Sequence, residues 1–185
     1  MATSPPERGA RYAIYVDGSC DHRLAMGAAA EIRPLHAEMQ PLVSHVLGRK
    51  GYFVGPTASE LTSMILGYRA YGIFQSSTSG DAVRCLDITM FTDSAHGLKY
   101  LDGFTPTSAA GWKLLPLINL LRAEARLRPE LHVWKCSRAE NCAHHAAVRA
   151  MRVARDGAGD VAWNGDGDLL AALLEVEART RAVHP

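Results

Sequence analysis

Three acidic side chains occupy positions from which a chain could gather them for metal-assisted chemistry. Asp17 ends a β-rich run and is followed by a Gly-Ser turn, Asp93 ends a second such run, and Glu60 lies near the start of a helical stretch between them. Three neighbouring carboxylates repel one another and need a counter-charge. Mg²⁺ and Mn²⁺ fit this need because both prefer oxygen ligands. Two such ions would form a phosphoryl-transfer centre, in which one activates water and the other stabilises the leaving oxygen.

The predicted secondary structure explains how these acids could meet. Apolar runs with turn signals predict five strands, and helical spacing predicts five helices. The strands are expected at 11–17, 26–32, 51–54, 85–93 and 131–136, and the helices at about 57–72, 94–101, 112–127, 141–154 and 169–183. This order favours an α/β fold with a mixed sheet flanked by helices, in which the strand of Asp17 lies centrally beside that of Asp93. Both aspartates would then lie at the carboxyl ends of adjacent parallel strands.

Several local features of the sequence predict details of these elements. Gly72 falls on the apolar stripe of the first helix and marks a place where that helix weakens or ends. Pro116 is tolerated only in a first helical turn, so the regular part of the helix at 112–127 starts there. On that helix Glu124 is expected to face outward, and Trp134 is expected to pack against the core. Residues 42–47 are compatible with a strand or a short helix.

The second predicted strand, 26–32, is made largely of small residues. Small side chains allow a neighbouring helix or a ligand backbone to approach closely. Glu60 is expected in the first turn of its helix, where an acidic side chain is also favoured simply by the helix dipole.

Composition bounds the class of protein and its partners. At 185 residues the chain is long enough for one domain with a sizeable core. Hydrophobic residues at 48% and charged residues at 21% are typical of a globular protein. The formal net charge of +1 provides no general attraction for nucleic acid, so a polyanion would need a local basic patch.

The predicted layout is a disordered segment at 1–10, the main domain at 11–154, a linker at 155–167 and a C-terminal helix at 168–185. The four cysteines form no zinc pattern, and the polar N-terminus has no secretory signal. No apolar run reaches membrane-spanning length. We therefore expect a cytoplasmic, intracellular protein with reduced thiols and no membrane partner.

Four short motifs, in order, resemble the ribonuclease H family, type 1, and are most similar to its archaeal-like branch. They are Val16-Asp-Gly-Ser19, Thr57-Ala-Ser-Glu-Leu61, Phe91-Thr-Asp-Ser94 and the segment from Trp134 to Ala146. The resemblance covers about residues 11–154. It implies a ribonuclease H-like fold, with a five-stranded mixed sheet flanked by helices. It also implies an endonuclease that uses two Mg²⁺ or Mn²⁺ ions to hydrolyse the RNA strand of RNA–DNA hybrids.

The last motif departs from the family at one position. The archaeal-like branch has an Arg, then an Asn three residues on, then an acid four residues beyond; Arg138 and Asn141 match, whereas His145 stands in place of the acid. Imidazole can still bind a metal and suits manganese better than magnesium. The resemblance therefore implies a catalytic and metal-binding set of Asp17, Glu60, Asp93 and His145, with His144 as the alternative if the helix register shifts by one residue.

Six further residues are candidates for substrate binding: Gly18, Ser19, Thr57, Ser94, Arg138 and Asn141. The guanidinium of Arg138 could donate two hydrogen bonds to phosphate oxygens. An equally good interpretation is that Arg138 is a solvent-exposed loop residue without a binding role. Ser19 and Thr57 could bond the 2′-hydroxyl that distinguishes RNA from DNA, or serve as turn and cap residues. Two other functions stay open: a non-catalytic nucleic-acid-binding or assembly module, and a nuclease acting on another nucleic acid. The sequence leaves the oligomeric state open.

Overall fold

The computed structural model describes residues 11–21, 25–35, 40–51, 55–77, 87–157 and 167–182. Several expectations fall outside these ranges. They concern the N-terminal segment 1–10, most of the strand expected at 51–54 and most of the linker at 155–167.

One mixed sheet forms the centre of the molecule. Its strands are β1 (Arg11–Asp21), β2 (Ala25–Pro34), β3 (Val43–Lys50), β4 (Asp87–Thr92) and β5 (His132–Lys135). The spatial order is β3-β2-β1-β4-β5, with β1 antiparallel to β2 and parallel to β4. The predicted fold class is confirmed, including the central strand of Asp17 beside the strand that precedes Asp93. The third strand covers 43–50, so the ambiguous segment 42–47 is largely strand.

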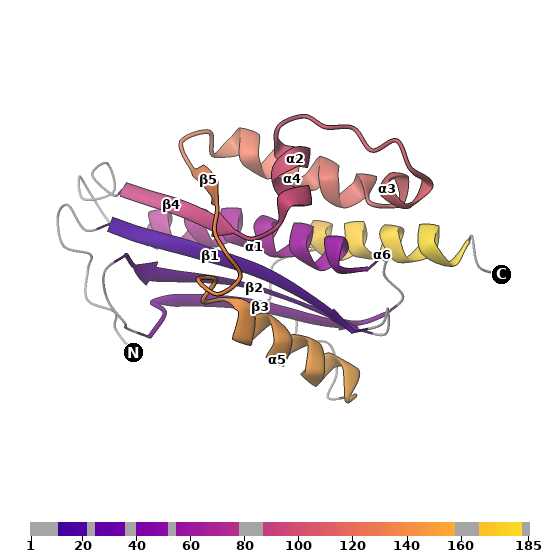
Figure 1. Ribbon diagram of the computed structural model, residues 1–185, viewed down its shortest axis with the longest axis horizontal. Coiled ribbons are helices and arrows are strands. Elements are labelled where there is room, and N and C mark those ends of the chain that lie inside the picture. The colour runs from indigo at the N-terminus through magenta and orange to yellow at the C-terminus, as the bar shows by residue number, and fades with distance from the viewer. Residues whose placement is uncertain are drawn as a thin grey trace.

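The described residues form six helices around this sheet: α1 (Pro56–Ser77), α2 (Ala95–Leu101), α3 (Ala109–Lys113), α4 (Leu115–Leu127), α5 (His144–Arg155) and α6 (Gly167–Arg181). Helix α5 lies on one face of the sheet, whereas α1 covers the other, with α4 and α6 beyond it (Figure 1). Among the described residues, no helix is both long and apolar enough to cross a membrane.

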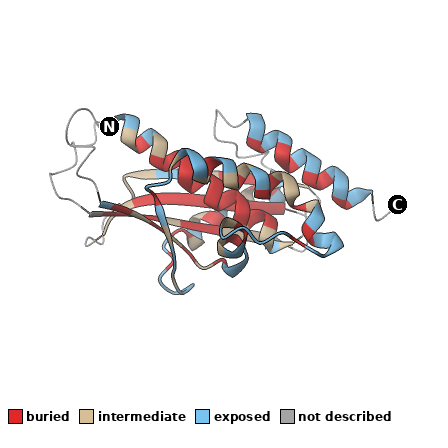
Figure 2. Ribbon diagram, turned by 90° about the horizontal axis from the view of Figure 1, so that it is seen from above, coloured by how far each residue is buried: buried red, intermediate tan, exposed pale blue. Residues whose placement is uncertain are grey.

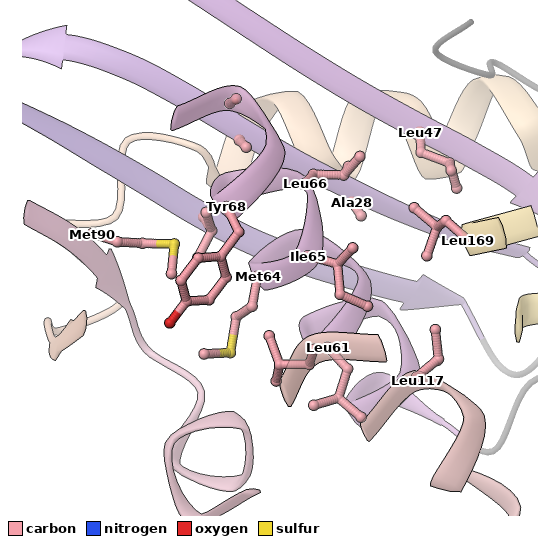
Figure 3. Packing of buried hydrophobic residues seen from close by; sticks show 14 of the residues in the cluster. Ala28, Leu47, Leu61, Met64, Ile65, Leu66, Tyr68, Met90, Leu117 and Leu169 are labelled. Atoms are coloured by element: carbon pink, nitrogen blue, oxygen red, sulfur yellow. The ribbon is translucent and has the colours of Figure 1, made fainter. Parts of the chain in front are cut away.

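Helix α1 is buried on nearly all sides because it lies between the sheet and the outer helices. Leu61, Met64, Ile65 and Leu66 are fully buried, and they contact residues from both neighbouring layers (Figure 3). Strands are mostly buried, whereas the outer faces of the flanking helices are exposed (Figure 2). The expected end of α1 near Gly72 is wrong: the helix continues to Ser77. The bare Gly72 backbone instead makes room for the guanidinium of Arg128.

On the opposite face, the small residues of β2 let α5 approach closely, as the sequence predicts. A Cβ atom at Gly27 would lie 2.1 Å from the backbone oxygen of Ala147 and 2.5 Å from the nitrogen of Met151. Ala29 packs against Ala143 and Ala147 in the same way. The start of α5 is thereby fixed directly above β1 and β2.

Two expectations about the second half of the chain need correction. The helix expected at 112–127 is divided into α3 and α4, with Leu114 between them. Pro116 lies in the first turn of α4, as expected, because it has no N–H to donate to the carbonyl of Trp112. Trp134 is 63% exposed rather than packed in the core. It alternates with Val133, which does contact the core, so its ring points to the other face of the edge strand β5.

Glu124 is buried, contrary to expectation, because it takes part in an ion network. Its carboxylate accepts a hydrogen bond of 2.7 Å from Arg69 Nε and pairs also with Arg128. Arg69 Nη2 in turn donates to Asp168 at 2.8 Å. This network joins α1, α4 and α6, so α6 is docked on the body, where Leu169, Leu173 and Val176 enter the core.

We predict that Glu124→Gln lowers the free energy of unfolding by about 3 kcal/mol or more, because it leaves two arginine charges without their buried partner. Glu175→Gln, which removes an exposed pair with Arg179, should change it by about 0.5 kcal/mol at most. Urea unfolding measures both values. Equal losses in the two variants would show that the buried network contributes no more than a surface pair.

Candidate active site

The carboxyl ends of β1 and β4 bring Asp17 and Asp93 together. Val16 pairs with Thr92 across the two parallel strands, and each aspartate is the next residue along its chain. Asp93 contributes to raising the pKa of Asp17 through their like charge. The sequence-based placement of both acids at one edge of the sheet is therefore confirmed.

Glu60 reaches the same region because α1 crosses β1 in direct backbone contact. A Cβ atom at Gly18 would lie 2.2 Å from the carbonyl carbon of Ser59 and 2.3 Å from the nitrogen of Glu60. Only glycine leaves room for this approach. Helix α1 begins at Pro56 and has no acid in its first turn, so Glu60 stands later than expected and the helix dipole does not explain it.

Asp17 is 5% exposed and has hydrogen bonds to both oxygens. Its Oδ1 accepts from the Gly18 backbone at 2.8 Å, and its Oδ2 lies 2.6 Å from Nδ1 of His144. Burial raises the pKa of Asp17, and the nearby charge of Asp93 adds to this effect. The hydrogen bond from His144 partly offsets it by lowering the pKa.

Asn141 holds three parts of the site in place. Its buried side-chain amide donates to the carbonyl oxygen of Val16 at 2.9 Å and to Asp93 Oδ1 at 3.2 Å. Its own oxygen accepts from the backbone of Ala143, one residue before α5. Asn141 therefore ties β1, the second aspartate and the start of α5 to one another, which is a positioning role.

Ser94 plays a matching part for Glu60. Its hydroxyl donates to Glu60 Oε2 at 2.7 Å and accepts from the backbone of Gly97 at 2.9 Å, so that it also caps α2. The Glu60 carboxylate is thereby directed toward the loop that carries Asp93.

His144, rather than His145, contacts Asp17. His145 is exposed and, together with Arg33, Ser44 and Arg149, lines a groove between α5 and the strands β2 and β3. The two imidazole centroids are 5.8 Å apart. Consecutive helical residues differ by about 100° around the axis, so only one of the two can face the aspartates. The one-residue shift considered from the sequence is the arrangement that occurs.

Three other substrate-binding candidates differ in whether they contact the His144–Asp17 pair. Arg138 is exposed, with Nη2 3.4 Å from Nε2 of His144. Ser19 is directed toward α5, where its hydroxyl donates to the sulfur of Met151 at 3.5 Å. Thr57 is half-buried in the first turn of α1. Of these three, only Arg138 touches the His144–Asp17 pair.

The side chains provide suitable metal donors in an open arrangement. Within the described ranges, no three His, Cys, Asp or Glu side chains lie close enough together to enclose a metal ion. The donor set is nonetheless three carboxylates and an imidazole, and the charge of Asp93 helps to raise the pKa of Asp17. A divalent cation near them would offset both the burial and the repulsion of Asp17. Mg²⁺ or Mn²⁺ therefore fits the chemistry of these residues.

No protein-family model matches this sequence, and no curated protein matches it as a relative. Solved structures do match in fold. The N-terminal RNase H domain of a Mycobacterium tuberculosis protein is 16% identical, with a TM-score of 0.53 over 80% of this chain and 96% of that chain. LC11-RNase H1, solved with an RNA/DNA hybrid, is 15% identical, with a TM-score of 0.57 over 80% and 98%. RNase H1 of the archaeon Halobacterium salinarum is 18% identical, with a TM-score of 0.52 over 79% and 98%. The chain thus has the ribonuclease H-like fold.

We predict that Gly18→Ala lowers the free energy of unfolding by about 1–3 kcal/mol, because the new methyl group forces β1 and α1 apart. Gly167→Ala, at an exposed position with no atom within 4 Å of the added Cβ, serves as the control and should be neutral or slightly stabilising. Chemical denaturation compares the two. A Gly18→Ala protein as stable as the control would contradict the close contact.

Proposed function

We propose that this protein is a ribonuclease H-type endonuclease that hydrolyses the RNA strand of RNA–DNA hybrids with the help of divalent metal ions. The observation that carries the proposal is the meeting of Asp17 and Asp93 at the ends of parallel strands, with Glu60 brought in by the glycine contact. The ribonuclease H-like fold supports it, and one structure that shares this fold was solved with an RNA/DNA hybrid.

Asp17, Asp93 and Glu60 would hold Mg²⁺ or Mn²⁺ through oxygen atoms, and His144 would add a ring nitrogen. The bound ions would supply an activated water and stabilise the leaving oxygen of the scissile phosphate. His144 takes the place that the sequence resemblance assigns to His145, because it is the imidazole in contact with Asp17. Its nitrogen donor favours Mn²⁺ over Mg²⁺.

The remaining residues orient these groups and the substrate. Asn141 and Ser94 fix the Asp93 and Glu60 carboxylates by direct hydrogen bonds. Arg138, which is exposed and lies beside His144, would donate paired hydrogen bonds to oxygens of the reacting phosphate. Selectivity for a hybrid would come from backbone shape and 2′-hydroxyl contacts rather than from reading bases.

A second candidate is a nucleic-acid-binding module without catalysis. One observation favours it: each carboxylate already has a protein partner, namely His144 for Asp17, Ser94 for Glu60 and Asn141 for Asp93. A network satisfied in this way is stable without an ion. Hybrid binding with no cleavage in either metal would identify this function.

We predict that the protein cleaves a labelled RNA–DNA hybrid and that Asp17→Asn abolishes cleavage, because the buried carboxylate at the centre of the site loses its charge. Asp102→Asn, an exposed position at the end of α2, is the matched control and should retain full activity. Gel assays with Mg²⁺ and with Mn²⁺ test both. Absence of cleavage by the folded wild-type protein in both metals would reject the proposed activity.

Faster cleavage of branched or double-stranded nucleic acid than of the RNA–DNA hybrid would show that the substrate is another nucleic acid.

The two adjacent histidines provide a sharper test. His144→Ala should lower the cleavage rate at saturating hybrid by about a hundredfold, since it removes the partner of Asp17. His145→Ala should keep the rate within about threefold, because its ring faces away from the aspartates. The reverse ranking would restore the assignment based on the family motif.

Metal binding can be measured without activity. We expect Mn²⁺ to raise the melting temperature of the wild-type protein, because a ligand that binds only the folded state stabilises it. In Asp17→Asn the rise should be absent, whereas Asp102→Asn should show the wild-type shift. An equal shift in all three proteins would place the ion elsewhere.

A further inference from the structure

Helix α5 carries charges of one sign on its outer side. It contains three arginines and two histidines and no acid. Arg149 and Arg152 follow His145 at intervals of four and three residues, so these three side chains lie along one face of the helix. All three are exposed. We call them the α5 basic ridge.

The arginines of this ridge form no ion pair within the part of the chain that the structure describes, although the charge of Arg152 helps to lower the pKa of Asp156. Arg155, at the end of the same helix, pairs with Asp21 and Asp156. Arg149 and Arg152 make no ion pair among the described residues. Since the whole chain has a net charge of only +1, the ridge is a local concentration of charge rather than part of a basic surface.

Two acids near the ridge have hydrogen-bond donors of their own. Glu31, which lines the groove beside it, is 6% exposed and accepts hydrogen bonds of 3.1 and 2.7 Å from Nε and Nη2 of Arg33. Glu140, before the start of α5, accepts from the hydroxyl and the backbone of Ser137. Neither carboxylate is bonded to Arg149 or Arg152, so these two guanidinium groups can contact an external anion.

The ridge begins at the candidate active site and is accompanied by a groove. His144 contacts Asp17, and the next residue, His145, starts the ridge. The groove has a volume of about 480 Å³ and is lined by Arg33, Ser44, His145 and Arg149 among others. From His145 to Arg152 the helix rises about 10 Å, which spans about three phosphates along one strand of a duplex. Among the described residues, α5 is the helix on this face of the sheet, and the other helices lie on the opposite face (Figure 1).

We propose that the α5 basic ridge binds the phosphate backbone of the nucleic acid next to the nucleotide held at Asp17. The inference rests on the proposed function for its substrate class, a nucleic-acid duplex. Arginine side chains bind phosphate oxygens without regard to sequence, and such contacts set the position of a duplex rather than its specificity. The ridge would thus supply the local basic patch that a nearly neutral chain needs for binding a polyanion.

The test measures binding separately from cleavage. In an Asp17→Asn background, fluorescence anisotropy gives the affinity for a labelled RNA–DNA hybrid between about 50 and 200 mM salt. Arg149→Gln and Arg152→Gln should each lower the slope of log affinity against log salt by about 0.9. Each should also weaken binding by about three- to tenfold at low salt. Arg126→Gln, an exposed helical arginine on α4 with no ion pair among the described residues, is the control and should stay within about twofold.

The outcomes separate this inference from the proposed function. Cleavage by the wild-type protein together with unchanged salt slopes in both ridge variants would overturn the ridge alone. Arginine-dependent binding without cleavage would support the ridge and reject the proposed activity. Equal losses in Arg126→Gln, or no binding to any nucleic acid, would overturn the ridge. Loss of binding to phosphatidylserine vesicles, with hybrid binding intact in the same variants, would assign the ridge to a lipid surface and overturn its role in binding nucleic acid. Equal urea midpoints establish that the variants are folded.

Discussion

The backbone contact between β1 and α1 at Gly18 is the constraint on which the candidate site depends. It brings the helix so close to the strand that Glu60 lies at the end of the sheet, where Ser94 donates a hydrogen bond to its carboxylate. The parallel pairing of β1 with β4 then supplies Asp93. Helix α1 can cross the sheet at this distance because it is buried on nearly all sides, between the strands and the outer helices. The core and the site are therefore stabilised by the same packing.

Gathering acids has an electrostatic cost, and the structure meets it with neighbouring donors. His144, Asn141 and Ser94 each bond one carboxylate, and each belongs to a segment that also begins or precedes a helix. The pKa of Asp17 is still raised, because burial outweighs the hydrogen bonds from His144 and from the Gly18 backbone. A site in this state favours a cation, and the same bonds keep it ordered before one binds. This balance is compatible with catalysis and also explains why a binding module is the second candidate.

Helix α5 serves two purposes through its two sides. Its inner side is made of alanines that rest on the small residues of β2, which sets the helix close enough for His144 to reach Asp17. Its outer side carries the arginines of the basic ridge. Close packing on one side thus fixes where the charges of the other side stand relative to the aspartates. The active-site contact and the proposed backbone contact are linked through one rigid element.

The sequence by itself determined the fold class, the central strand of Asp17, the placement of Asp93 beside it and the close approach of a helix to β2, because these follow from strand order, local periodicity and side-chain size. It did not determine which histidine faces the aspartates. That choice depends on where α5 begins and how it rotates on the sheet, and both are set by Asn141 and the alanine contacts. The burial of Glu124 and the exposure of Trp134 were likewise decided by tertiary structure. Glu124 is drawn inward by Arg69 from a distant helix, and Trp134 lies on the edge strand β5 with its side chain exposed, so neither could be inferred from the local pattern.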